Sequence, residues 1–280
     1  MPANINTLTV VDLVPFGLER EHGGFYALRL SRPNWADWTP GQFVMIRPET
    51  WGPELPWARP LSICMLSADL ILFFQIVGRG SKRLAELRHG DKVQVVGPLG
   101  TGFQVEKDTP TLLLAGGMGI VPFVGYVQRH PGPNALSLLF GHRAPLEYYP
   151  FEHFDDKVEA RHFHEAGPED LTLFLNTVDE RVASYAARNG LVLACGPLPF
   201  LRAVQGMCLK HKARAQLSLE SRMACGAGAC LGCVVKPLLD EASGRNRSAQ
   251  DIPEQMHKGL PVPTCTCGPV FWADSIDLKD

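Results

Sequence analysis

Three cysteines lie within nine residues in the stretch CGAGACLGC, which runs from Cys225 to Cys233 of the 280-residue chain. Their spacing, C-x4-C-x2-C, is that of plant-type [2Fe–2S] proteins, in which a distant fourth cysteine completes the ligand set. The remaining residues are almost all Gly and Ala, and glycine lets a backbone pass close to a bulky group. We therefore predict that Cys225, Cys230 and Cys233 bind a [2Fe–2S] cluster.

The fourth ligand has two candidates, Cys265 and Cys267, in the stretch TCTCGPVF near the C-terminus. Two alternatives to the cluster remain. A four-cysteine zinc site usually pairs two C-x2-C motifs, and the loop at 225–233 supplies one. A group of buried free thiols is the other alternative.

The N-terminal segment has no basic stretch followed by an apolar core, so we expect no secretory signal. We predict a cytoplasmic protein, in which stable disulfides are rare. No apolar run reaches the ~18 residues of a membrane-spanning helix. The net charge of −2 gives no electrostatic reason to expect a nucleic-acid partner.

Residues 1–104 contain β-branched and aromatic runs bounded by Gly, Pro and Asp, which are typical of strands. These runs are 41–48, 70–78 and 92–98. Their spacing predicts an N-terminal antiparallel β-barrel.

Beyond position 104 the pattern changes to apolar runs that end in glycine, alternating with helical spacing, which predicts a central α/β domain with a parallel sheet. The predicted strands are 111–117, 135–141, 171–176 and 191–197, and the predicted helices are 123–130 and 200–211. We thus expect a multi-domain α+β fold with a barrel at 1–104, an α/β domain at 105–214 and a small cysteine-rich module at 215–280. Within that module, the polar segment 237–263 is predicted to be a surface insertion or a loose helix.

Two stretches of the barrel suit a flavin nucleotide. In IVGRGSKRLAEL (76–87), Gly78 and Gly80 stand between a strand and a predicted helix, whose first N–H groups suit a pyrophosphate. Arg59 and Arg79 can add charge-assisted hydrogen bonds, and Ser62 can hydrogen-bond a flavin ring. The alternative for ARPLSI (58–63) is an ordinary junction between a turn and a strand.

The stretch LLLAGGMGIVPF (112–123) is a strand, a glycine turn and a helix start. Gly116, Gly117 and Gly119 would let a dinucleotide pyrophosphate approach the helix; the alternative is a tight structural turn. Cys195 and Gly196 follow another predicted strand at the same sheet edge, where open α/β sheets bind ligands. Cys195 is therefore a candidate neighbour of a nicotinamide, or else a small buried apolar residue.

Six motifs taken in order resemble the ferredoxin–NADP reductase superfamily with a C-terminal iron–sulfur module. They are RPLSI, IVGRGS, GPLGTGF, AGGMGIVP, ACGPLPFLRAV and SLESRMACGAGACLGCVV. Together they look most like the electron-transfer subunits of NAD-dependent dihydroorotate dehydrogenases. The resemblance implies an FAD-binding barrel, an NAD-binding α/β domain and Cys265 as the fourth cluster ligand. It also implies that FAD is bound by Arg59, Pro60, Leu61, Ser62, Gly80 and Ser81.

The same resemblance implies that electrons pass between NAD(H), FAD, the cluster and a flavin-containing dihydroorotate dehydrogenase catalytic subunit. It also implies that the two kinds of subunit form a heterotetramer, which acts in pyrimidine biosynthesis. Flavin is the necessary middle carrier, because a nicotinamide delivers electrons in pairs and the cluster accepts them singly. We expect no acid–base catalytic residues. Alternative partners are a ferredoxin, a hydrogenase or a sulfur-reducing enzyme. A different alternative is a zinc-stabilised binding module without redox function.

Two features depart from the family pattern. The first is the long gap between Cys233 and Cys265. The second is that the region LFLNTVDERVASYAARNG lacks a Thr-Asp-Asp-Gly-like loop, so the choice between NADH and NADPH stays open. Three apolar residues near the cluster are candidates for contacts with a partner protein: Met223, Leu231 and Val234. The alternative is that they pack within the cysteine-rich module. In the stretch HFHE, three polar residues are interpreted as a solvated strand face or loop rather than a metal site: His162, His164 and Glu165.

Overall fold

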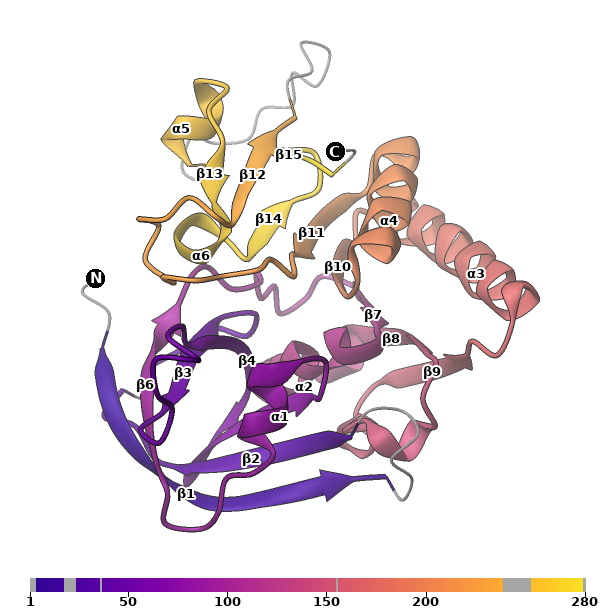
Figure 1. The fold of residues 1–280 in the computed structure, drawn as a ribbon. Helices are drawn as coiled ribbons and strands as arrows, with labels where there is room; N and C mark the ends of the chain where they lie inside the picture. The colour runs from indigo at the N-terminus through magenta and orange to yellow at the C-terminus, as the bar shows by residue number, and fades with distance from the viewer. Residues whose placement is uncertain (1–3, 18–23, 36, 155, 239–252, 279–280) are drawn as a thin grey trace.

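The computed structural model describes residues 4–17, 24–35, 37–154, 156–238 and 253–278. Figure 1 shows a barrel at the lower left, a sheet with flanking helices at the right and a small C-terminal unit above both. Most of the predicted polar insertion, residues 239–252, lies outside the described residues. No helix in the described part of the chain is long and apolar enough to span a membrane.

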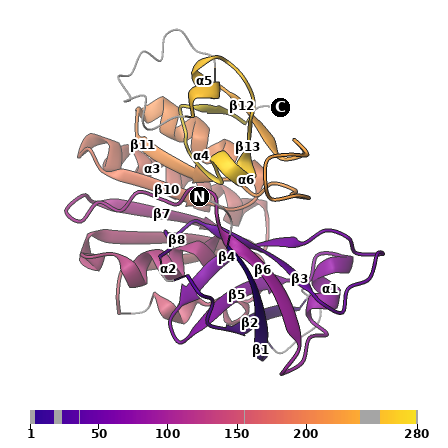
Figure 2. The ribbon, with the colours of Figure 1, turned by 90° about the vertical axis from the view of Figure 1, so that its left-hand side faces the viewer.

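The N-terminal strands close into an antiparallel barrel in the order β1-β2-β5-β4-β3-β6, which confirms the predicted barrel. These strands are β1 (Ile5–Phe16), β2 (Phe25–Ser31), β3 (Phe43–Pro48), β4 (Arg59–Leu66), β5 (Asp69–Gln75) and β6 (Lys92–Leu99). A short helix, α1 (Arg79–Leu84), follows β5. Figure 2 shows α1 at the outer end of the barrel, away from the sheet. The barrel interior is filled by apolar side chains, because alternate residues of each strand point inward.

The central sheet has the strand order β14-β11-β10-β7-β8-β9, with all neighbours parallel except the β11–β14 pair. Its strands are β7 (Thr111–Gly116), β8 (Leu136–His142), β9 (Glu159–His164), β10 (Leu191–Cys195), β11 (Arg214–Ser218) and β14 (Val270–Trp272). Every residue of β7, β8 and β10 is buried, which explains why these strands appear as continuous apolar runs. The predicted parallel sheet is confirmed.

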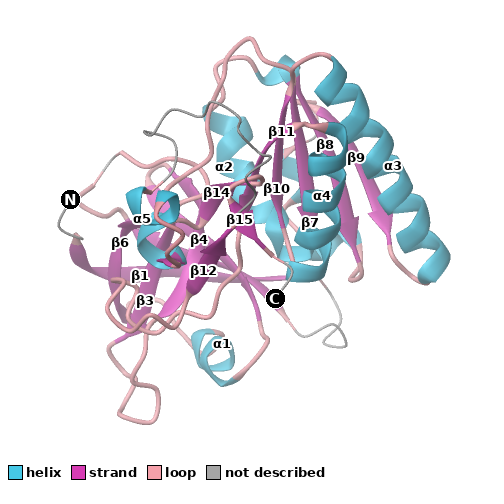
Figure 3. Ribbon diagram, turned by 90° about the horizontal axis from the view of Figure 1, so that it is seen from above, coloured by secondary structure: helices cyan, strands magenta, loops and turns pink. Residues whose placement is uncertain are grey.

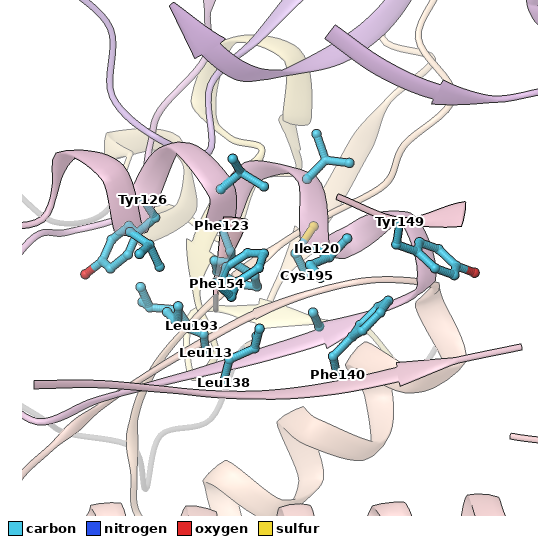
Figure 4. Close-up of a cluster of buried hydrophobic side chains, with 14 of the residues drawn as sticks. Leu113, Ile120, Phe123, Tyr126, Leu138, Phe140, Tyr149, Phe154, Leu193 and Cys195 are labelled. Atoms are coloured by element: carbon cyan, nitrogen blue, oxygen red, sulfur yellow. The ribbon is translucent and has the colours of Figure 1, made fainter. Parts of the chain in front are cut away.

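Helices cover both faces of this sheet. Figure 3 shows α2 (Val121–Arg129) on one side of the strands, and α3 (Pro168–Ala187) and α4 (Leu198–His211) on the other. Phe123 and Tyr126 of α2 pack over Leu113 of β7, as Figure 4 shows, in a buried group that also includes barrel residues. The barrel and the sheet therefore share one apolar core on the α2 side.

One predicted strand is wrong, because residues 171–176 lie inside α3. The helix begins after Gly167, where the Asp170 carboxylate accepts the Gly167 N–H at 2.9 Å. Within LTLFLN, Phe174 is buried while Leu173 is 60% exposed, so the run faces two directions. The buried residues of the helix recur at helical spacing: Phe174, Val178, Val182 and Tyr185. A short apolar run fits the two-residue period of a strand as well as the 3.6-residue period of a helix. The longer amphipathic pattern is that of a helix.

The C-terminal unit is a small antiparallel sheet in the order β13-β12-β15, with two one-turn helices. Its elements are β12 (Val234–Pro237), α5 (Glu254–His257), β13 (Val262–Pro263), α6 (Thr264–Cys267) and β15 (Ile276–Asp277). The strand β14 leaves this unit to join the central sheet beside β11. The cysteine loop, residues 225–233, connects β11 to β12 and is thereby held between the sheet and the C-terminal unit.

Candidate functional site

A cavity of about 810 Å³ lies where the barrel meets the carboxyl edge of the central sheet. Its walls come from β4, the start of α1, the end of β10 and the segment after β11. Eight of the predicted cofactor residues line it: Arg59, Pro60, Leu61, Ser62, Gly78, Gly80, Ser81 and Cys195. The volume falls in the usual range for small-molecule sites, ~300–1,000 Å³. The fold thus gathers the predicted flavin residues in one cavity and brings Cys195 of the predicted nucleotide site to its wall.

Arg59 stands at the start of β4 on the cavity wall. Its guanidinium donates to the carbonyl oxygen of Trp57 at 2.6 Å and lies 5.3 Å from the ring centroid of Trp51. Burial, with a smaller contribution from nearby Arg79, lowers the pKa of Arg59. Among the described residues, no carboxylate pairs with either guanidinium, and two such adjacent groups suit an anionic ligand such as a pyrophosphate.

The turn before α1 is shaped by Ser81. Its hydroxyl oxygen accepts the N–H groups of Val77 at 2.9 Å and Gly78 at 3.1 Å, which fixes the start of the helix. A Cβ added at Gly78 would meet no atom within 4 Å, so the cavity is open there. At Gly80 a Cβ would collide with the guanidinium of Arg59. The two glycines therefore differ: one borders open space, and the other makes room for Arg59.

The glycine turn after β7 adjoins the same cavity. Gly117 has φ of +53° and no atom within 4 Å of an added Cβ, which suits close approach of a ligand. Gly119 packs directly against the backbone of Cys195 and Gly196, so a Cβ there would lie 2.6 Å from the Gly196 nitrogen. Gly116 is extended and faces Phe200. The cavity lining does not include Gly116, Gly117, Gly119 or Gly196. It does include Met118 of the turn and Val121, the first residue of α2.

Cys195 and Glu220 both line the cavity at the edge of the sheet. Burial raises the pKa of the Cys195 thiol, and the charge of Glu220 raises it further. Glu220 is exposed to the cavity, but the surrounding protein removes part of the water around its carboxyl group. This desolvation raises the pKa of the carboxyl group. The sequence reasoning missed Glu220. Its signal was a carboxylate two residues beyond β11, at the edge where parallel sheets bind ligands.

The cysteine loop presents sulfur atoms with N–H donors around them. The Ala227 N–H donates to Cys225 Sγ at 3.4 Å, and the Gly228 N–H donates to Cys265 Sγ at 3.2 Å. Hydrogen bonds from Ala227 and then Cys230 lower the pKa of the Cys225 thiol to about 6. Burial, and then Cys233, raise the pKa of the Cys265 thiol to about 12. The interactions that shift these pKa values link Cys225 with Cys230, and Cys265 with Cys233 and Cys225, so the four predicted ligands lie close together.

The loop follows an unusual backbone path. Gly226 and Gly228 have φ of +67° and +76°, and Leu231 adopts +53° although it is not glycine. Gly232, the third glycine of the loop, does not have a positive φ. A Cβ at Gly226 would lie 2.7 Å from Met45 of β3, so the loop passes directly over the barrel. Leu231 and Val234 are 62% and 46% exposed, whereas Met223 is half-buried.

Cys265 and Cys267 have different surroundings. Cys265 is buried and accepts the hydrogen bond from the loop, while Cys267 packs with the apolar group around α4 and β14. The set of four that fits a binuclear cluster is therefore Cys225, Cys230, Cys233 and Cys265. Among the described residues, no group of three or more His, Cys, Asp or Glu side chains is arranged to hold a single metal ion.

The histidines of HFHE lie on β9, as predicted for a strand face. His162 Nδ1 lies 3.1 Å from Nε2 of His142, whose Nδ1 donates to the Ala144 carbonyl at 2.7 Å. His164 Nε2 donates to the Arg143 carbonyl at 3.0 Å. Burial lowers the pKa of His142. His142 is thus hydrogen-bonded to His162, and its ring centroid lies 5.4 Å from that of His164.

Comparisons with known proteins agree with this geometry. Residues 220–248 match the iron–sulfur cluster binding domain of dihydroorotate dehydrogenase B. The electron transfer subunit of dihydroorotate dehydrogenase B (NAD(+)) from Caldanaerobacter subterraneus subsp. tengcongensis is 30% identical over 238 residues, covering 85% of this chain and 86% of the relative. The subunit of the same name from Listeria monocytogenes serotype 4b is 30% identical over 271 residues, covering 90% and 93%.

Two solved structures share the fold. The NADH-dependent reduced ferredoxin-NADP oxidoreductase aligns with a TM-score of 0.73 at 20% identity, covering 97% of this chain and 90% of that chain. The ferredoxin-NADP+ reductase from Plasmodium falciparum aligns with a TM-score of 0.61 at 14% identity, covering 74% and 90%.

Proposed function

The chain belongs to the family of electron-transfer subunits of dihydroorotate dehydrogenase B, and on that premise we propose which of its residues carry out the transfer. It is an oxidoreductase component that works with NAD, FAD and a [2Fe–2S] cluster. When bound, FAD converts the electron pair of a nicotinamide hydride into single electrons for the cluster. The observation that carries the assignment of residues is the shared cavity between β4, α1 and the sheet edge.

On the barrel side, we assign FAD binding to Arg59, Pro60, Leu61, Ser62, Gly78, Gly80 and Ser81. Arg59 and the N–H groups at the start of α1 would hold the pyrophosphate, because both present positive charge or donors to the cavity. Ser62 would hydrogen-bond the flavin ring from β4. The hydroxyl of Ser81 keeps the turn in shape by accepting two backbone N–H groups.

On the sheet side, we assign NAD binding to Gly116, Gly117, Gly119, Cys195 and Gly196. The open, left-handed Gly117 would admit the pyrophosphate, and Gly119 sets the turn tightly against β10. Cys195 is neutral at physiological pH because burial raises its thiol pKa. It therefore supplies a small uncharged wall beside the nicotinamide rather than a nucleophile.

The cluster ligands are assigned to Cys225, Cys230, Cys233 and Cys265. The sulfur atoms of Cys225 and Cys265 already accept backbone N–H groups, the donors that stabilise thiolates and bridging sulfides.

The family implies a dihydroorotate dehydrogenase catalytic subunit as partner. We propose that this partner contains flavin, that the complex is a heterotetramer, and that it works in the cytoplasm, where the cysteines stay reduced. We further propose the division into a barrel at 1–104, a nucleotide domain at 105–214 and a cluster module at 215–280.

An anaerobic titration with NADH, and separately with NADPH, tests this assignment. We expect flavin absorbance to bleach first and cluster absorbance to follow. The Cys230→Ser variant should keep its flavin but contain no cluster; loss of both groups, or of neither, would contradict the assignment. Co-purification with the catalytic subunit, followed by mass determination of the complex, tests the heterotetramer.

A further inference from the structure

Two side chains belong both to the cavity and to the surroundings of the cluster cysteines. Phe43 lines the cavity and also belongs to the buried group that contains Met45, Cys233 and Cys265. Met223 lines the cavity too, and it packs against that same buried group. The flavin side of the site and the cluster side therefore have a common wall, which we call the shared wall and define as Phe43 and Met223.

Phe43 is rigidly held in this wall. It is the first residue of β3, its cross-strand partner on β4 is Ser62, and it is 3% exposed. A residue opposite Ser62 lies close to whatever group Ser62 contacts, because directly paired residues of antiparallel strands are ~4.5–5.5 Å apart. Phe43 thus adjoins both the proposed flavin position and the cysteines.

Met223 joins the wall from a distant part of the chain, the segment before the cysteine loop. It precedes the cysteine loop by two residues and follows Glu220, Ser221 and Arg222, which also line the cavity. The segment from the cavity to the first cluster cysteine is thus short. The loop itself is fixed on the barrel by the close approach of Gly226 to Met45. The distance across the wall is consequently set by packing on both sides.

We propose that Phe43 and Met223 are positioning residues that hold the flavin and the cluster at a fixed separation across a dry, closely packed wall. This inference rests on the proposed cofactor assignment. The step it governs is a one-electron transfer: the reduced flavin loses one electron, the oxidised cluster gains it, and no heavy atom moves. Electron tunnelling falls steeply with distance and is weaker across a gap than across packed atoms. Replacing a large wall side chain with a small one leaves a void that the surroundings fill only partly.

The test uses the loaded chain alone, without nucleotide or partner. A light pulse with a photoreductant injects single electrons, and the rate at which the flavin and cluster spectra interconvert is recorded. We expect Phe43→Ala to slow that rate several-fold, while flavin content, iron content and both reduction potentials stay near the wild-type values. Phe43→Met, which refills most of the space, should recover most of the rate.

Two further variants keep the proposal falsifiable. Met223→Ala should also slow the transfer, and it changes a half-buried loop residue rather than the barrel. Phe74→Ala is the matched control, because Phe74 lines the cavity but does not belong to the group around the cysteines. An unchanged rate in both Phe43→Ala and Met223→Ala, or equal slowing in Phe74→Ala, overturns the proposal. If the wild-type chain loads no flavin or no cluster, it is the cofactor assignment that fails.

Discussion

Gly119 lies where the turn after β7 touches the end of β10, and the substitution Gly119→Ala tests this contact. An added Cβ would lie far inside 3.0 Å of the Cys195 carbonyl, a separation that real Cβ atoms essentially never show. It would also lie 2.6 Å from the Gly196 nitrogen. These atoms are backbone atoms of a buried strand end, so no side chain can rotate away and the turn itself must move.

The size of the effect follows from that geometry. Inserting a methyl group into a packed site costs about 1–3 kcal/mol, and a backbone collision belongs at the upper end. At about 2–4 °C per kcal/mol, a cost of ~3 kcal/mol lowers the melting temperature by roughly 6–12 °C. Because the displaced turn also carries Gly117, we expect NADH to bind about tenfold more weakly, a loss of about 1.4 kcal/mol.

The assay is thermal unfolding together with an NADH binding titration, and Gly206→Ala is the matched control. Gly206 lies inside α4 with no atom within 4 Å of an added Cβ. Alanine there should stabilise the protein by about 0.5–1 kcal/mol, because glycine is unfavourable in a helix interior. If Gly119→Ala melted at or above the wild-type temperature and bound NADH normally, the contact with β10 would not constrain the turn.

Three further predictions concern the fourth cluster ligand, Glu220 and Ser81. Cys265→Ser should abolish the iron and sulfide content while Cys267→Ser leaves it intact, as measured by chemical analysis after anaerobic purification; equal losses would refute the choice of ligand. Glu220→Gln should match the wild type in thermal stability at about pH 4 and exceed it increasingly as pH rises, because the raised carboxyl pKa means that ionisation in the folded state is unfavourable. A stability difference that does not vary with pH would contradict that reasoning. Ser81→Ala should lower stability by about 1 kcal/mol through loss of the helix cap and weaken FAD binding to the flavin-free chain. Unchanged FAD affinity would show that the turn keeps its shape without the hydroxyl.

Much of the fold was predictable from the sequence because its signals are local. The strands β7, β8 and β10 are buried on both faces, so they had to be continuous apolar runs. The C-x4-C-x2-C spacing is likewise contained in nine residues. The stretch 171–176 was predicted wrongly because six apolar-rich residues fit a strand and a helix alike. Only packing over the full length of α3 distinguishes them.

Other features required the tertiary structure. Spacing left Cys265 and Cys267 equivalent, and the hydrogen bond from Gly228 to Cys265 distinguishes them. Phe43 and Met223 are far apart in the sequence and meet only because the cysteine loop folds over the barrel.

The sequence by itself determined the element types, the cysteine loop and the two glycine turns, because backbone periodicity and ligand spacing are properties of short segments. The tertiary structure alone decided that the residues predicted to bind flavin, the carboxyl edge of the sheet and the predicted cluster cysteines adjoin one another. That arrangement depends on how the barrel packs against the sheet through their common apolar core, and no short segment carries information about contacts made by distant ones.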